Sequence, residues 1–231
     1  MSSTSSTLHF RVLSALLQYP EQALIDALPE CEAVLDEAAM RARLAPVLAH
    51  LAGASLVTVQ EAYVDTFDRG RKYSLHLFEH LHGESRERGP ALVDLMQAYQ
   101  REGFDIDANE LPDYLPLFLE FLGSVPAAVA QSFLDEAIHI IGALGERLRA
   151  AASPYACVFD LLVSLASIAP QPLQQPPVRD MDEAMETFGP THTGMEPLLK
   201  RQTQAMTFYP QPPRQHAPHE AAAHAAPGME A

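Results

Sequence analysis

Apolar residues recur at helical spacing through most of the first 169 positions of the chain. Leu8, Val12 and the apolar residues after them fall on one face of a helix that Pro20 is expected to end. The same spacing predicts further helices over residues 21–28, 30–52, 55–67, 73–81, 85–103, 112–123, 126–151 and 154–169. Pro29 and Pro46 are expected to break the run, because proline has no N–H group for a helical hydrogen bond. No segment alternates apolar and polar residues as a half-buried strand does, so the predicted fold class is all-α.

The segment over residues 112–123 (PDYLPLFLEFLG) is apolar on nearly every side. Asp113 is expected to be its N-cap, which places Pro116 at the third helical position, where no intrahelical hydrogen bond is lost. After Leu115 only Pro116 and Glu120 interrupt the apolar run. A helix of this kind belongs at the centre of a domain or beneath a bound partner.

The composition changes after residue 169, where 11 of the 19 prolines fall among Gln, His and Ala. Such a segment cannot bury enough apolar surface to offset the entropy lost on ordering. We therefore predict one helical-bundle-like domain of eight or nine helices over residues 8–169, after a flexible N-terminus at 1–7. The Pro-rich tail at 170–231 is expected to be mostly disordered, although residues 181–188 (MDEAMETF) can form a short helix.

The charge balance disfavours a nucleic-acid partner. The chain carries 15 Lys and Arg against 30 Asp and Glu, a net charge of −15, whereas the phosphates of nucleic acid require a basic face. An acidic surface attracts cationic partners instead. The N-terminus has no basic n-region or twin arginine, and we expect no apolar run of about 18 residues, the length that spans a membrane.

Two cysteines, Cys31 and Cys157, stand far apart in apolar helical contexts without metal-binding spacing. We expect both to be free thiols in a reducing compartment. Together with the charge and the N-terminus, they predict a cytoplasmic protein that is not embedded in a membrane.

The densest run of His, Arg, Asp and Glu lies between residues 63 and 89. Within it His76 and His80 are four residues apart, so on a helix both rings would share one face, and Glu79 between them resembles the inverted zincin pattern. His82 would offer a further nitrogen, but no later segment supplies a third-ligand motif. Helix-surface or hydrogen-bonded histidines are the preferred interpretation, and a zinc hydrolase is a remote alternative. No nucleophile or phosphate-binding motif is present, so we predict no catalytic residue, metal or cofactor, and no enzyme.

The charges of this run permit two interpretations. Arg69, Arg71 and Arg88 have several acidic neighbours, which fits an internal ion-pair network that braces a loop. The alternative is a loop that forms the rim of a peptide-binding groove. Between Arg101 and Asp160 there are ten acids and three bases. An acidic rim around an apolar helix suits a basic amphipathic peptide, while a solvated acidic surface remains the other interpretation.

Three motifs resemble those of a known family: YVDTFD at 63–68, SLHLFEHLHGESRERG at 74–89 and ELPDYLPLFLEFL at 110–122. They are similar to the NarJ (NarJ/NarW) nitrate reductase assembly chaperones, within the wider TorD/DmsD-like group. The resemblance covers roughly residues 8–169 and implies an all-helical, cytoplasmic, non-catalytic protein. It implies that the partner is the apo catalytic (alpha) subunit of respiratory nitrate reductase, bound through its N-terminal peptide. The chaperone would hold that subunit for insertion of the molybdenum cofactor and an iron–sulfur cluster before membrane docking.

The resemblance also admits contacts with molybdenum cofactor biosynthesis proteins. The alternative within the same group is a proofreading chaperone that binds the twin-arginine leader of an exported molybdoenzyme. The residues expected to bind the peptide are Glu110, Asp113, Tyr114, Leu117, Phe118, Glu120 and Phe121. The residues expected to form the other groove wall, as a structural corner, are Arg71, Phe78, Glu79, His80, His82, Arg86 and Arg88.

Overall fold

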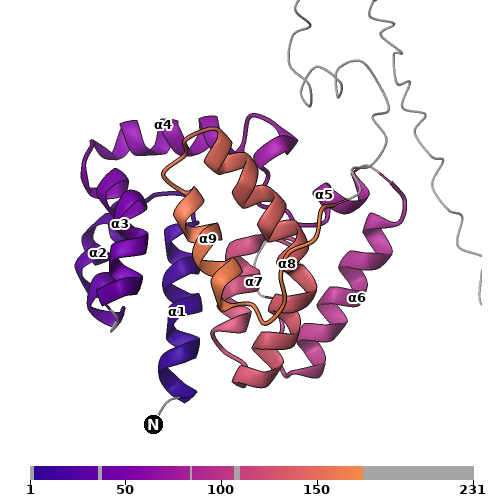
Figure 1. The fold of residues 1–231 in the computed structure, drawn as a ribbon. Helices are drawn as coiled ribbons and strands as arrows, with labels where there is room; N and C mark the ends of the chain where they lie inside the picture. The colour runs from indigo at the N-terminus through magenta and orange to yellow at the C-terminus, as the bar shows by residue number, and fades with distance from the viewer. Residues whose placement is uncertain (1–2, 36–37, 84, 107–109, 174–231) are drawn as a thin grey trace, which may run out of the picture. The chain divides into compact units, whose positions relative to one another are not determined.

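A computed structural model of the chain describes residues 3–35, 38–83, 85–106 and 110–173. These residues form nine α-helices and one 3₁₀ helix, η1 (Figure 1). In chain order they are α1 Ser3–Leu16, α2 Gln22–Val34, α3 Ala38–Ala52, α4 Leu56–Phe67, η1 Arg71–Tyr73, α5 Glu79–His82, α6 Arg88–Arg101, α7 Leu115–Leu122, α8 Ala127–Ala150 and α9 Ala156–Leu165. Within the same ranges the only β-pairing is an isolated antiparallel bridge between His76 and Tyr114. The predicted all-α class is confirmed.

The helix breaks predicted at Pro29 and Pro46 are wrong. Pro29 lies inside α2 and Pro46 inside α3. Both prolines are exposed, so water can reach the carbonyl groups that lose their helical partners. On either side of Pro46, Leu44 and Val47 are fully buried. Burial of these neighbours outweighs the missing hydrogen bond, and the helix continues.

Several ends also differ from those predicted. Helix α1 begins at Ser3, inside the lead-in predicted for residues 1–7, and α9 ends at Leu165 rather than near residue 169. The short helix predicted at 181–188 lies outside the described residues, and the predicted division into lead-in, domain and tail stays a prediction.

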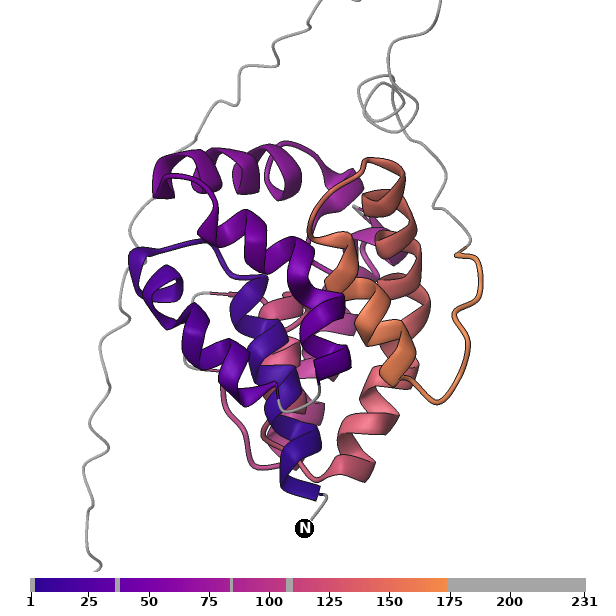
Figure 2. The same cartoon turned by 60° about the vertical axis from the view of Figure 1, so that its left-hand side comes forward.

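Helix α7 lies at the centre of the fold, as its apolar sequence predicts. It packs against α1 on one side and α8 on another, and α8 packs against α9 (Figures 1 and 2). Six of its eight residues are buried. Glu120 is exposed and Leu117 half-buried, so these two positions mark the face of α7 that the core leaves uncovered.

Helix α2 is attached to this core much more lightly. Leu28 is its only buried residue, although Ile25 and Cys31 pack partly against the core. Helix α8, by contrast, has ten buried residues. The two helices therefore differ in how firmly the core holds them in place.

Residues 166–173 run alongside α8 (the orange tube in Figure 1). The backbone N–H of Ser167 donates a hydrogen bond of 2.8 Å to Asp135 Oδ1 on α8. Further along, a Cβ atom added to Gly142 would lie only 2.5 Å from Cβ of Pro170. Because glycine has no side chain, α8 can accept this segment in direct contact.

By length and apolar composition alone, α8 is long enough to cross a membrane. Helices α3 and α4 meet the same criterion only if the two, which are bent by 117°, are counted as one span. The expectation that no such segment exists is therefore corrected for α8. Its apolar residues pack on α7 and α9. The central helix of a protein core passes the same test.

A close approach between α8 and α9 gives a test of the packing. A Cβ atom added to Gly145 would lie 2.8 Å from Cβ of Phe159. We expect Gly145→Ala to lower the free energy of unfolding by about 1–3 kcal/mol, because an overpacked core must shift. The control is Gly89→Ala, since Gly89 lies in the first turn of α6 and a Cβ there meets nothing within 4 Å. Urea denaturation measures both variants, and an equal or smaller loss in Gly145→Ala would contradict the close packing.

Candidate functional site

The segment before α5 is extended rather than helical. The two helical turns predicted over residues 73–81 are wrong for residues 74–78 and correct for 79–81, which lie in α5: η1 ends at Tyr73, α5 begins at Glu79, and the residues between them pair with the start of α7. The N–H of Leu77 donates to the carbonyl of Asp113 at 3.0 Å, and the N–H of Leu115 donates to that of Leu75 at 2.8 Å. Long-range pairing has replaced the local helix.

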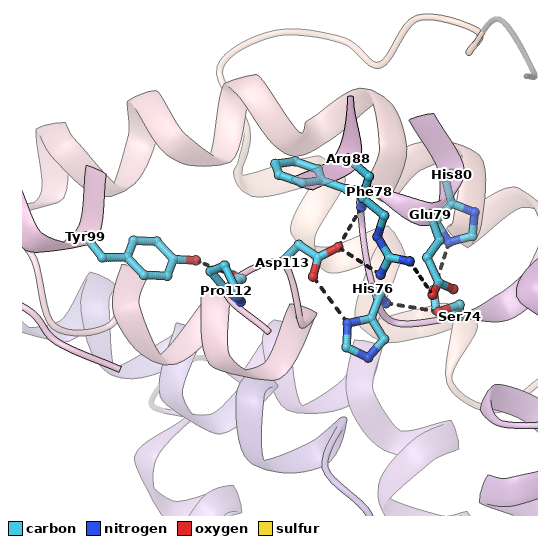
Figure 3. A network of polar contacts seen from close by, with 9 residues as sticks. All are labelled: Ser74, His76, Phe78, Glu79, His80, Arg88, Tyr99, Pro112 and Asp113. Carbon is cyan, nitrogen blue, oxygen red and sulfur yellow. Dashed lines mark hydrogen bonds and ion pairs between the residues drawn. The ribbon is translucent and has the colours of Figure 1, made fainter. Parts of the chain in front are cut away.

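The Asp113 side chain completes this junction (Figure 3). This side chain is fully buried. The N-cap role predicted for Asp113 is wrong, because Tyr114 occupies the N-cap position of α7. Asp113 Oδ2 accepts a hydrogen bond of 3.0 Å from the N–H of Phe78, and Asp113 Oδ1 lies 3.3 Å from Nδ1 of His76. The Arg88 guanidinium lies 3.9 Å from Oδ2. One carboxylate thus connects the extended segment, α6 and the start of α7.

His76 and His80 do not share a helical face. His76 belongs to the extended segment, where the hydrogen bond to Asp113 raises the pKa of its ring. His80 belongs to α5 and is buried; its Nε2 donates to the carbonyl of Ser74 at 2.8 Å, and its Nδ1 accepts from the Arg147 guanidinium at 3.1 Å. Burial lowers the pKa of His80, opposed by the bond to Ser74. The shared face that the zinc interpretation requires is not formed.

No group of three or more His, Cys, Asp or Glu side chains suited to a metal ion occurs in the described parts of the chain. The two described cysteines lie apart as free thiols. Glu79, which lies between the two histidines of the zincin-like pattern, forms an ion pair with Arg88: the guanidinium lies 3.1 Å from the Glu79 carboxylate. These side chains serve the structure of the corner.

The predicted ion-pair network is present in part. Arg88 bridges Glu79 and Asp113, and the exposed Arg69 pairs with Asp65 at 2.8 Å. The rings of His82 and Phe78 meet edge to face, with centroids 5.8 Å apart. These internal contacts connect the residues of the corner, and the structural role expected for the whole set stays a prediction.

A groove of about 610 Å³ opens between α1, α2 and α7. We call it the apolar groove. Its lining consists of Ala15, Gln18, Tyr19, Glu21, Ala23, Leu24, Ala27, Cys31, Glu110, Tyr114, Pro116, Leu117 and Glu120. Three carboxylates stand on it, and none of these lining residues is Lys or Arg.

A second hollow of about 340 Å³ adjoins the apolar groove. Both contain Tyr19, Glu110 and Tyr114 in their linings. We call this one the aromatic hollow; it is lined by Tyr19, Tyr63, Phe67, Asp68, Ser74, Leu75, His76, Glu110 and Tyr114. A third hollow follows, shares Asp68 and His76, and includes Arg71 and Glu79. Each hollow thus shares lining residues with the next.

The predicted peptide-binding residues divide into two sets. Glu110, Tyr114, Leu117 and Glu120 line the apolar groove, as the hypothesis requires. Asp113, Phe118 and Phe121 are buried, with at most 5% of their surface exposed, so they do not line it. The reason is that α7 is covered on most sides, and an apolar helix sequence does not show which side stays open.

The predicted second wall also needs correction. Of its seven residues, Arg71 and Glu79 line the third hollow, and Phe78, His80, His82, Arg86 and Arg88 line none of the three. The apolar groove is instead completed by α1 and α2, which sequence reasoning missed. A signal was available, because Leu24, Ala27 and Cys31 follow helical spacing on one face of α2.

An all-helical core whose polar corner is internally bonded, and whose open face is an acid-lined groove, is the construction of a binding protein. The family model for the nitrate reductase delta subunit matches residues 32–160, a range that contains all three motifs quoted above. The chain therefore belongs to the nitrate reductase delta subunit family.

Three relatives make the comparison specific. The probable nitrate reductase molybdenum cofactor assembly chaperone NarW of Escherichia coli (strain K12) is 41% identical over 160 residues, 68% of this chain and 67% of that protein. The nitrate reductase molybdenum cofactor assembly chaperone NarJ of the same strain is 40% identical over 166 residues, 68% of this chain and 69% of its own length. The probable NarJ of Bacillus subtilis (strain 168) is 34% identical over 167 residues, 71% of this chain and 91% of that protein. The resemblance to NarJ and NarW is confirmed, and so is the non-enzymatic class, because these relatives are assembly chaperones.

The buried carboxylate gives the first test of the junction. We expect Asp113→Ala to lower the free energy of unfolding by about 3 kcal/mol, because the N–H of Phe78 and the Arg88 guanidinium lose a buried partner. The control is Asp65→Ala, which removes the exposed ion pair with Arg69 and should cost less than about 1 kcal/mol. Urea denaturation measures both, and similar losses would contradict a structural role for Asp113.

The buried imidazole gives a pH-dependent test. The pKa of His80 is lowered in the folded state from its ordinary value of 6.5. At a pH below 6.5 the ring of His80 therefore takes up a proton when the chain unfolds. The stability that neutral His80 contributes is thus present above that pH and falls as pH drops through it. We expect His80→Gln to lose less stability than wild type between pH 8 and pH 5. The raised pKa of His76 makes its contribution to stability grow as pH falls, and this contribution is the same in wild type and in the variant. Equal losses of stability in the two proteins would contradict the burial of neutral His80.

Proposed function

We propose that this chain is a nitrate reductase molybdenum cofactor assembly chaperone, which binds the catalytic subunit of the enzyme before the cofactor is inserted. The observation that carries the proposal is the 40% identity to NarJ across about two thirds of both chains. In this proposal the molybdenum cofactor is cargo of the partner, and the chaperone works in the cytoplasm. Molybdenum cofactor biosynthesis proteins are further candidate partners.

The apolar groove is the proposed seat for the N-terminal peptide of that subunit. Leu24 on α2 and Leu117 on α7 are half-buried and offer apolar surface that a helical peptide can cover. Burial of two or three large apolar side chains of the peptide contributes about 1.5–3 kcal/mol each. Ordering the peptide costs about 2–5 kcal/mol. The balance supports micromolar to nanomolar binding, from which a chaperone can release its partner.

The charge of the groove supports a basic peptide. Glu21, Glu110 and Glu120 stand on the apolar groove without a lysine or arginine among its lining residues. Carboxylates at the rim of an interface select the partner and speed its approach more than they add affinity. An amphipathic peptide with an apolar stripe and basic flanks therefore suits this groove.

The proposal is tested by titration calorimetry of the full-length chain with the N-terminal peptide of the nitrate reductase catalytic subunit from the same organism. We expect wild type to bind and Leu117→Gln to weaken binding at least about tenfold, since one buried leucine contributes about 1.5–3 kcal/mol. The control is Val57→Gln, because Val57 is the most exposed large apolar residue described, at 62%, and lies on α4 outside the groove.

Three results would overturn parts of this proposal. No detectable heat with wild type at high micromolar peptide would remove the N-terminal peptide as the ligand. Tighter binding of a twin-arginine leader peptide than of the nitrate reductase peptide would favour the proofreading alternative. Equal weakening by Leu117→Gln and Val57→Gln would place the peptide elsewhere.

A further inference from the structure

The aromatic hollow has a floor of rings that the core holds in place. Tyr63 and Phe67 of α4 are buried, with ring centroids 4.9 Å apart, and Tyr19 meets Tyr63 edge to face at 5.6 Å. The Tyr63 hydroxyl donates to the carbonyl of Leu17 at 2.9 Å and lies 3.3 Å from the hydroxyl of Tyr114. Tyr63 and Phe67 are therefore fixed beneath the hollow, while the exposed Tyr19 and the half-buried Tyr114 offer ring surface that can attract a cation.

Negative charge surrounds these rings. Asp68 is the C-cap residue of α4, and Glu110 stands just before α7; both are exposed and line the hollow. Burial raises the pKa of Tyr114, the hydrogen bond to Tyr63 opposes this, and the charges of Glu110 and Asp68 raise it further. The C-terminal end of α4 adds the negative end of a helix dipole.

The lining of the aromatic hollow itself contains no lysine or arginine. Arg69 and Arg71 line the third hollow, which shares Asp68 with it. His76 lines it too, but its Nδ1 is directed to the buried Asp113. Among the hydrogen bonds and ion pairs of the described residues, none engages the side chain of Asp68 or Glu110. Two carboxylates thus face an aromatic hollow without an internal partner there.

We propose that the aromatic hollow is a cation subsite that accepts a Lys or Arg side chain of the bound peptide. This inference rests on the proposed function, because the hollow shares Tyr19, Glu110 and Tyr114 with the apolar groove. A peptide seated in that groove reaches the hollow with a neighbouring side chain. The methylene stem of lysine or arginine packs against the tyrosine rings while its charged end meets the carboxylates.

The size of the hollow favours a side chain over the terminal ammonium group. About 340 Å³ is more than a single ammonium fills, and the buried rings at the floor lie below the exposed carboxylates at the rim. A long, partly apolar side chain contacts both. The subsite would therefore fix the register of the peptide in the groove, since one basic residue must fall at one place.

A double-mutant cycle by titration calorimetry tests the subsite on the full-length chain. The protein variant is Asp68→Asn/Glu110→Gln, and the probe is the N-terminal peptide of the nitrate reductase catalytic subunit with each Lys or Arg replaced in turn by norleucine. We expect the protein variant to bind the unchanged peptide about tenfold more weakly, because the basic side chain loses two ion pairs. One norleucine peptide should lose at least as much with wild type, since its cation–π contact is lost too, and the variant should lower the affinity for that peptide no further.

The matched control is Asp94→Asn/Glu136→Gln, which removes the same charge from exposed positions on α6 and α8 that line none of the three hollows. An equal loss in the control would overturn the subsite in favour of general attraction by the acidic surface. The subsite would also be overturned if, for every norleucine peptide, the loss of affinity from the peptide change and the loss from the protein change simply add. If N-acetylation of the peptide instead weakens binding to wild type and causes no further loss with the variant, the site holds the terminal ammonium, and the side-chain assignment is overturned.

Failure of the subsite and failure of the proposed function give different results. If wild type binds the peptide but the cycle shows no coupling, the chaperone proposal stands and the cation subsite falls. If wild type binds none of the peptides, the proposed groove is overturned and the subsite with it. Circular dichroism of both protein variants checks that each keeps its helical content.

Discussion

The buried carboxylate of Asp113 is the constraint on which the groove depends. It accepts from the backbone of Phe78 and faces His76 and Arg88, so it fixes the extended segment against the start of α7. Tyr114 follows it directly and is paired with His76 through the isolated bridge. The ring that borders both the apolar groove and the aromatic hollow is therefore positioned from within the core. Asp113 acts on the site by holding Tyr114, without facing it.

The helices could be predicted from the sequence because their signal is local. Apolar residues at helical spacing and an apolar α7 are sufficient for the class and the central helix. The extended segment could not be predicted, because it pairs with residues more than thirty positions further along the chain. Pairing over that distance produces no periodic pattern of apolar residues in the segment itself. The same holds for Asp113, whose local pattern is that of an N-cap while its partners are distant. Periodicity also fails on α7, where Phe118 and Phe121 look the same as Leu117, and only Glu120 marks the open side.

The acidic residues of this chain serve two distinct purposes. Glu79 and Asp113 are bonded inside the corner, while Asp68 and Glu110 face the hollows. The sequence shows only that acids are numerous; the structure separates the acids bonded inside the corner from those exposed on the hollows. The resemblance to NarJ, confirmed by the family comparison, gave the class of partner, and the acids on the hollows are where we propose that this partner binds.

The light attachment of α2 has a consequence for how such a groove can evolve. The side made by α1 and α7 is tied to the core: Ser14 Oγ on α1 donates to the carbonyl of Pro116 at 2.7 Å. The side made by α2 has one buried residue, Leu28. Substitutions on its exposed face cost little stability, because few core contacts change. If the groove holds the proposed peptide, substitutions on α2 can alter selectivity while α1 and α7 preserve the fold. Chaperone and peptide could then change together without loss of the folded state.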